Sequence, residues 1–385
     1  MSVSRNERGI ALVITLLVVA LLTITVIEFT YSVEIDQHMA RNALNGLQAS
    51  LLARAGINLG EAFLLHDDHP EFDSYLEDWG NMDELNSQLV LPDNMRLRVQ
   101  VIDESGKLNI NLTRPTNVIE WKRMATATAQ NPLPSLAQVA RDALRQLLQA
   151  QGGDAQTEDA LEAYWDLLFR SVYGDPATAR IGQGNTPSAT PVPVVNLNQF
   201  DFPSLEDASV IPGLTPSLIR RLRPYVTALP SGVKVNANTA PRAVLEVILG
   251  DSGVVDDIIS QRQGDGLKAA DITQLAARVN TGTTSGSAVN HGGALLVATS
   301  LFFRIRASAI VNPNPFTGLG GIRRSAEMLV MRVQRRVPAT TGAAGNGLHW
   351  TLTRMDWQKE PGAVLFEHEP GVDGEPTPGV SGMGG

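Results

Sequence analysis

The sequence predicts an α+β protein in which a long N-terminal helix packs on a small antiparallel sheet, with a large helical domain inserted into that sheet. Three observations support this fold class. An uncharged apolar run occupies 10–27, near the N-terminus. Alternating patterns typical of strands occur near 95–112 and again after 298, and the region 113–297 between them has helical periodicity. A helix and a sheet that each carry an apolar face are expected to bury those faces against one another.

The apolar run near the N-terminus predicts a membrane-spanning segment. No charged residue occurs from Ile10 to Ile27, and eighteen residues at 1.5 Å each reach about 27 Å, which is enough to cross the hydrocarbon core. Arg5 and Arg8 precede the run, so the N-terminus is expected in the cytoplasm and the bulk outside. No Ala-x-Ala cleavage site follows it, which disfavours an ordinary secretory signal and leaves a plain signal anchor open.

The helical pattern continues beyond the membrane segment as a stalk. Apolar residues recur at three- and four-residue steps from Phe29 to Leu59, and no proline occurs before Pro70. One helix over 10–66 is the simplest account. Its outer half carries an apolar stripe that a sheet would cover, or that would pack beside related helices in a fibre, with the leucines of the stripe at Leu44, Leu47, Leu51, Leu52 and Leu59.

The predicted sheet comes in two pieces. Residues 95–101 alternate as a half-buried strand, 103–106 supply a turn, and 107–112 are expected to return as a second strand. Later strands are expected at 300–311, 325–335 and 349–357. The α/β unit is thus assigned to 67–112 plus 298–360 and the helical insert to 113–297, and the Gly- and Pro-rich segment 361–385 is expected to be disordered.

One segment of the helical insert has specific turn chemistry. Ile211-Pro212-Gly213-Leu214-Thr215 opens a helix, and Val235-Asn236-Ala237-Asn238-Thr239-Ala240-Pro241 precedes another that Asn238 or Thr239 is expected to cap. These phrases resemble helix-hairpin-helix DNA-binding modules and, more broadly, SAM-like helical units, with nearby cations at Arg220, Arg221 and Arg223. The alternative is a helical domain that keeps this turn for packing alone.

Composition restricts the function classes. The chain has 385 residues, no cysteine and a formal net charge of −9, so it has no disulfides or thiolate sites, and a general nucleic-acid role is disfavoured. Its six histidines show no paired metal-ligand spacing on a helix, and no nucleophile elbow, phosphate loop or dinucleotide fingerprint occurs. The sequence therefore predicts an assembly role and no enzymatic activity.

The order of the motifs carries a family resemblance. Arg8-Gly9 against an apolar helix, then Asp103-Glu104-Ser105-Gly106-Lys107-Leu108-Asn109-Ile110-Asn111, then the two phrases of the insert, resembles the K-type minor pseudopilins of type II secretion systems, members of the pilin superfamily. The resemblance implies a leader at 1–9, cleavage between Gly9 and Ile10 by the prepilin peptidase, and methylation of the new N-terminus. It also implies a single-pass protein of the bacterial inner membrane with its bulk in the periplasm.

The position five residues after that cleavage point is also informative. Most pilins and pseudopilins carry a Glu there, whereas this chain has Ile14. The K-type proteins, which this chain resembles, also lack that Glu. The resemblance implies a subunit at the pseudopilus tip that nucleates assembly with the I, J and H types, the major pseudopilin and the inner-membrane platform. Expected packing residues are Ile14, Leu44, Leu47 and Leu51. A minor pilin of a type IV pilus, or a membrane-anchored DNA-binding protein, stays as an alternative.

The family resemblance further implies calcium in the helical domain, but the chain departs from that pattern. Trp165-Asp166 matches its start, yet Leu167, Leu168 and Phe169 follow where acids are expected. The candidate ligands are Glu158, Asp159, Asp166 and Asp175, with solvent-facing helix acids as the alternative. A second acidic cluster, over 67–78, is expected to be a solvated loop after the stalk.

Overall fold

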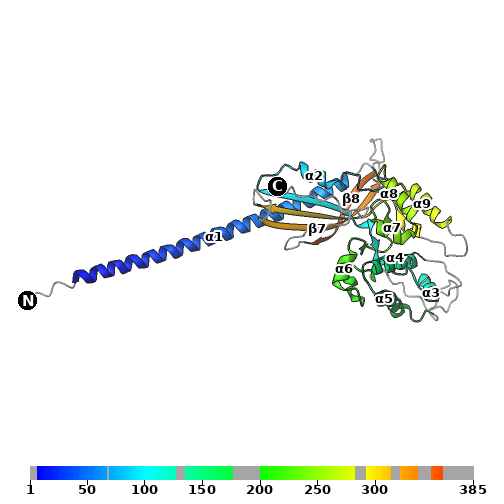
Figure 1. The fold of residues 1–385 in the computed structure, drawn as a ribbon, viewed down its shortest axis with the longest axis horizontal. Helices are drawn as coiled ribbons and strands as arrows, with labels where there is room; N and C mark the ends of the chain where they lie inside the picture. Colours follow the sequence, from blue (N-terminus) through cyan, green and yellow to red (C-terminus); the bar gives the residue numbers. More distant parts are fainter. Residues whose placement is uncertain are drawn as a thin grey trace, which may run out of the picture.

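The computed structural model describes residues 7–66, 69–126, 135–176, 200–281, 292–313, 321–336 and 348–358. Its longest element is the helix α1, Glu7–Leu65, which runs unbroken from the N-terminal region into the body of the protein. The first half of α1 projects clear of that body, and its second half lies along the sheet (Figure 1). The single stalk helix predicted from the sequence is confirmed.

A four-stranded antiparallel sheet in the order β1-β6-β7-β8 forms the core that α1 covers. The strands are β1 (Met95–Asp103), β6 (Phe302–Val311), β7 (Ile322–Arg336) and β8 (Leu348–Gln358). β8 is also tied to the helix, because the Arg354 guanidinium donates two 2.7 Å hydrogen bonds to the Glu61 carboxylate. The predicted late strands and the α+β class are therefore confirmed.

The face of α1 that meets the sheet has small residues at its closest contacts, beside the buried Ile57 and Leu64. Ala49 and Ala53 are buried there, and a Cβ on Gly56 would lie 2.8 Å from that of Ala307. A Cβ on Gly60 would come within 2.6 Å of Ile305 Cγ2. Small side chains let the helix backbone approach the strands closely. Of the leucines in the predicted stripe, Leu52 and Leu59 pack against the sheet core, whereas Leu44, Leu47 and Leu51 are exposed.

The free edge of β1 is covered by the short helix α2, Met82–Gln88. The Asn86 side chain donates from Nδ2 to the Val99 carbonyl oxygen at 2.8 Å and accepts from the Val99 amide at 2.9 Å. One asparagine thus satisfies both backbone groups of a residue that a neighbouring strand would otherwise pair. This arrangement blocks further strand addition at the middle of that edge.

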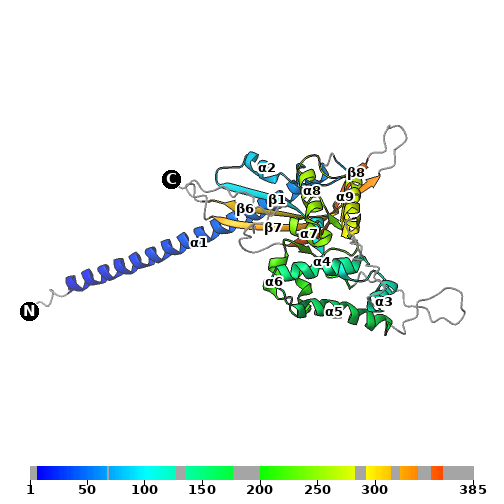
Figure 2. The same ribbon diagram turned by 45° about the vertical axis from the view of Figure 1, so that its right-hand side comes forward.

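The helical insert contains α3 (Val118–Thr126), α4 (Leu136–Ala150), α5 (Ala155–Tyr173), α6 (Pro216–Leu222), α7 (Arg242–Leu249), α8 (Ser252–Arg262) and α9 (Ala269–Thr281). In both overall views α3 to α6 lie together beside the sheet, while α7 to α9 lie near its end away from the membrane segment (Figures 1 and 2). Two short parallel pairs join its parts: β2 (Leu108–Asn109) with β3 (Val226–Thr227), and β4 (Val235–Asn236) with β5 (Leu296–Val297).

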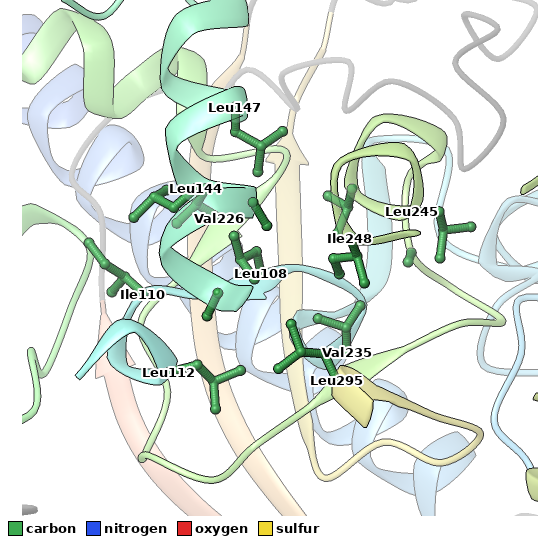
Figure 3. Close-up of a cluster of buried hydrophobic side chains, with 14 of the residues drawn as sticks. Leu108, Ile110, Leu112, Leu144, Leu147, Val226, Val235, Leu245, Ile248 and Leu295 are labelled. Atoms are coloured by element: carbon green, nitrogen blue, oxygen red, sulfur yellow. The ribbon is translucent and has the colours of Figure 1, made fainter. Parts of the chain in front are cut away.

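The expected second strand at 107–112 is wrong. After β1 the chain makes a 3-10 turn at Glu104–Gly106 and enters the helical insert, where β2 pairs with β3 and not with β1. Leu108, Ile110 and Leu112 are buried in the insert's own core with residues of α4 and α7 (Figure 3). The alternating pattern is genuine, but its apolar side chains are buried by helices far along the chain, and β6 takes the place beside β1.

Candidate functional site

The membrane half of α1 is apolar around its whole circumference. All side chains from Ile10 to Ser32 are exposed, and by length and composition this helix qualifies as a membrane span among the described residues. The hydroxyls of Thr15, Thr23 and Thr25 donate to carbonyl oxygens one turn earlier in the same helix. Polar groups satisfied within the helix in this way are compatible with a lipid environment.

The predicted processing point lies at the beginning of this segment. α1 starts at Glu7, so the bond between Gly9 and Ile10 falls in its first turn. Ile10 is 59% exposed and Ile14 56%, which leaves an uninterrupted apolar surface where most pilins would place a carboxylate. Cleavage and methylation at this point stay predictions.

The outer half of α1 has a second exposed apolar surface. Leu44, Leu47 and Leu51 are 55%, 58% and 55% exposed, on the side of the helix that does not meet the sheet. Their spacing of three and four residues places them on one face. Three exposed leucines on one face of a helix form an apolar surface that nothing within the described chain covers. We call these three residues the outer leucine stripe.

A buried polar junction connects the sheet to the helical insert. Asp103, at the end of β1, accepts hydrogen bonds at one carboxylate oxygen from the hydroxyls of Thr239 and Ser300, both at 2.5 Å, and from Asn236 Nδ2 at 3.2 Å. Its other oxygen accepts from the Ser105 amide at 2.8 Å. The donors come from the turn after β1, from the middle of the insert and from the residue pair just before β6, so this one carboxylate joins three separate chain segments.

The environment of Asp103 raises the pKa of its carboxyl group. Asp103 is 1% exposed, and burial raises its pKa to about 6 even though the Ser300, Thr239, Ser105 and Asn236 hydrogen bonds favour the charged form. The neighbouring Glu104 behaves in the opposite way. Burial alone would raise its pKa, but Arg304 and Lys107 outweigh that effect and lower it well below the usual range. The pKa values of two adjacent buried carboxyl groups are therefore shifted in opposite directions, because Glu104 has cations beside it.

A buried ion pair completes the junction on the sheet side. Arg332 is 0% exposed, lies between the rings of Phe303 and Trp350, and pairs with Asp73. Asp73 also accepts from the Ser300 amide at 2.6 Å. The prediction of a solvated loop over 67–78 is thus wrong at Asp73, which is 1% exposed. Asp67 and Asp68 lie outside the described residues.

The Asn-x-Asn-Thr phrase of the insert has a tertiary role in place of the expected capping. α7 begins at Arg242, and no side-chain cap bond is formed at its Pro241 N-cap. Asn238 instead donates to the Leu267 carbonyl oxygen and accepts from the Leu267 amide, at 2.9 and 2.7 Å. Thr239 bonds to Asp103, as described above. The capping prediction was wrong because longer-range partners hold both side chains.

The arginines near the Pro-Gly-Leu turn mostly serve contacts within the chain. Arg221 Nε donates to the Gln151 carbonyl oxygen at 2.8 Å, and Arg223 pairs with Glu206 at 2.5 Å. Gly213, at φ +93°, lies so close to α5 that an added Cβ would meet Thr157 Oγ1 at 2.0 Å. The turn therefore packs tightly against a neighbouring helix.

The candidate calcium ligands are spread along α5 and the residue after its C-cap. Among the described residues, no group of three or more His, Asp or Glu side chains is placed to hold a metal ion. Asp159 is exposed, and Asp166 and Asp175 both pair with Arg170, at 2.5 and 4.0 Å. The side chain of Glu158 lies outside the description. A calcium site stays a prediction.

Sequence comparison gives a direct relationship. No family model matches the chain. It is 26% identical to the type II secretion system protein K of Pseudomonas aeruginosa over 297 residues, which cover 73% of this chain and 81% of the relative. Over most of its length the chain is similar to a K-type secretion protein. The resemblance inferred from the motifs is thereby confirmed, and the relative's name is that of a secretion-system component and not of an enzyme.

A similar solved structure is the crystal structure of the GspK-GspI-GspJ complex from the type 2 secretion system of enterotoxigenic Escherichia coli. The match has a TM-score of 0.48 and 16% sequence identity, and it covers 84% of this chain and 100% of that one. Together with the apolar half of α1, the relationship to protein K fits a single-pass, membrane-anchored protein.

Proposed function

We propose that this protein is a minor pseudopilin at the tip of the type II secretion pseudopilus, where it nucleates assembly with the I, J and H types for the export of folded proteins across the outer membrane. The relationship to protein K supports the family part of the proposal. The observation that carries the tip position is Ile14, considered with the place of the helical insert.

Because of Ile14, the membrane half of α1 can accept a neighbouring subunit but lacks the usual carboxylate for joining one already in place. An early carboxylate would offset the positive N-terminus of a neighbouring subunit in apolar surroundings, where an unpaired charge is expensive. This chain offers an exposed isoleucine there instead. It therefore lacks the contact by which an ordinary subunit joins one already in place, and it is suited to be the first.

The helical insert argues in the same direction. It lies at the end of α1 that is farthest from the membrane segment, together with the distal end of the sheet (Figures 1 and 2). In a fibre of parallel helices, that space would be needed by the next subunit outward. A chain that fills it with its own domain is best accommodated where no further subunit follows.

The outer leucine stripe is the surface we assign to partner subunits. Leu44, Leu47 and Leu51 remain exposed although the same turns of the helix bury Ala49 and Ala53 against the sheet. Burying one leucine contributes about 2 kcal/mol, so three of them can hold a helix-to-helix contact. Contacts with the major pseudopilin and the assembly platform would use the apolar membrane half of α1.

The test is co-assembly of the full-length chain, purified in detergent, with the I, J and H types. We expect a mixed complex of defined mass by light scattering. Leu47→Ser is expected to weaken it about tenfold because an apolar contact is lost. The matched control is Leu76→Ser, since Leu76 is 57% exposed but belongs to the segment between α1 and α2 and not to the outer leucine stripe.

Three results would argue against the proposal. Long filaments of this chain alone, without affinity for the other minor subunits, would refute the tip position. Salt-sensitive micromolar binding to DNA would favour the membrane-anchored DNA-binding alternative. Assembly with type IV pilus subunits, and none with pseudopilins, would favour the minor-pilin alternative.

A further inference from the structure

The C-terminal end of α5 holds a charged cluster that the proposed function does not use. It begins at Asp166, the position that matches the family's calcium-binding phrase, and ends at Asp175 just beyond the helix. Arg170 stands between them in sequence, one helical turn after Asp166. Its position lets one side chain reach both carboxylates.

Both oxygens of Asp166 already have donors. The Trp121 indole Nε1 donates to Oδ1 at 3.0 Å, and Arg170 Nε donates to Oδ2 at 2.5 Å. Arg170 Nη1 lies 4.0 Å from an oxygen of Asp175. The guanidinium is thus placed where a cation shared by these two carboxylates would sit.

Two other acids of α5, Asp159 and Glu162, do not complete a shared ion site with Asp166. Asp159 lies seven residues earlier on the same helix, which places its Cα about 10 Å away along the axis, whereas calcium needs oxygens at about 2.4 Å. Glu162 is paired with Arg141 at 3.1 Å. The segments 127–134 and 177–199 contain no Asp or Glu in the sequence, so they supply no further carboxylate.

We propose that the Arg170 guanidinium is the built-in cation of this helical domain and replaces bound calcium. It links the end of α5 to the residue beyond its Gly174 C-cap, and through Asp166 it connects to Trp121 of α3. Beside it, Trp121 and Phe169 are buried, with their ring centroids 5.6 Å apart, and Tyr173 packs against both. The aromatic rings hold α3 on α5, and the guanidinium neutralises the adjoining carboxylates.

An arginine and a calcium ion differ in one testable way. The guanidinium is covalently part of the chain and stays protonated at every physiological pH, whereas a calcium ion leaves when a chelator lowers its concentration. The domain should therefore have the same stability with calcium as without it. This inference does not depend on where in a fibre the protein sits.

The test uses the full-length chain in detergent and follows its thermal unfolding by tryptophan fluorescence. We expect the same Tm in millimolar calcium and in excess EGTA. Arg170→Gln is expected to lower Tm by about 2 °C and Arg170→Lys by less, since lysine keeps the charge but loses the planar fork. The matched control is Arg145→Gln, because Arg145 pairs with Asp142 at 3.0 Å on α4 with similar exposure.

Two results would overturn the proposal. A rise in the Tm of the unmodified chain with calcium, or terbium emission sensitised by its tryptophans, would show that the carboxylates bind a metal ion after all. If Arg170→Gln lowers the Tm by no more than Arg145→Gln does, Arg170 forms only an ordinary surface ion pair.

Discussion

At the residue scale, Asp103 shows how one carboxylate organises a junction. It is the last residue of β1. Its partners Asn236, Thr239 and Ser300 lie between 133 and 197 positions further along the chain. Three side-chain donors at one oxygen favour the charged form, while complete burial opposes it more strongly. The junction is therefore held by strong hydrogen bonds around a group that is costly to ionise.

The raised pKa of Asp103 predicts a pH dependence. Because the folded pKa of about 6 exceeds the ordinary value of 3.8, the folded state binds the proton more tightly. The contribution of this group to the free energy of unfolding is complete below pH 3.8 and is lost as the pH rises through 6, by at most about 3 kcal/mol. Glu104 has the opposite sign, since its lowered pKa contributes stability above its ordinary value of 4.5 and loses it in strong acid.

Asp103→Asn tests this dependence. We expect the Tm of the variant to rise relative to that of the unmodified chain as the pH rises from 4 to 7, because asparagine does not ionise. Glu104 is present in both proteins and cancels in the difference. A Tm difference that stays constant across this range would contradict the raised pKa.

At the element scale, α1 separates two tasks between two faces. The face with Ala49, Ala53, Gly56 and Gly60 lies on the sheet, and the outer leucine stripe is left exposed. Small residues bring the helix close to β1 and β6, Ile57 and Leu64 fill the core beside them, and the three leucines of the stripe remain exposed. A helix can thus belong to its own core and still offer an apolar surface to another subunit.

Gly60→Leu tests the close contact of α1 with the sheet. A Cβ at this position would already lie 2.6 Å from Ile305 Cγ2, so a leucine must displace the strand or the helix. We expect the free energy of unfolding to fall by about 2 kcal/mol through overpacking. Ala62→Leu, on the exposed side of the same helix, is the control and should change stability little. Equal effects of the two substitutions would show that the helix-sheet distance is not limiting.

At the scale of the whole molecule, a thin membrane helix carries a bulky distal body. The apolar half of α1 makes no contact with that body, so anchoring and folding are physically separate (Figure 1). The length of the mature chain depends on whether the bond between Gly9 and Ile10 is cleaved.

We expect the mature protein to begin at Ile10, since cleavage after Gly9 removes the short basic leader and keeps the apolar helix intact. N-terminal sequencing of the protein from membranes would establish this start. Gly9→Leu is expected to block processing by crowding the peptidase site, with Gly46→Leu as a control of the same change far from that site. A mature start at Met1, or one beyond Thr30, would contradict a pilin-type leader.

The sequence by itself determined the features that depend on neighbouring residues. The uncharged run at 10–27, the single stalk helix and the strands predicted at 300–311, 325–335 and 349–357 follow from local periodicity, and the structure has the helix and the three strands at nearly these bounds. The family motifs also lie close together in the chain. Together these local signals were enough for the fold class and the relationship to protein K.

Only the tertiary structure decided which partners these elements meet. It directed 107–112 into the core of the insert, turned the small face of α1 to the sheet, and buried Asp73 beside Arg332. It also placed Thr239 on Asp103, 136 residues away, in place of a local helix cap. The physical reason is that a side chain's local pattern shows whether it will be buried, while the residue that buries it comes from a distant segment whose position depends on the packing of the whole chain.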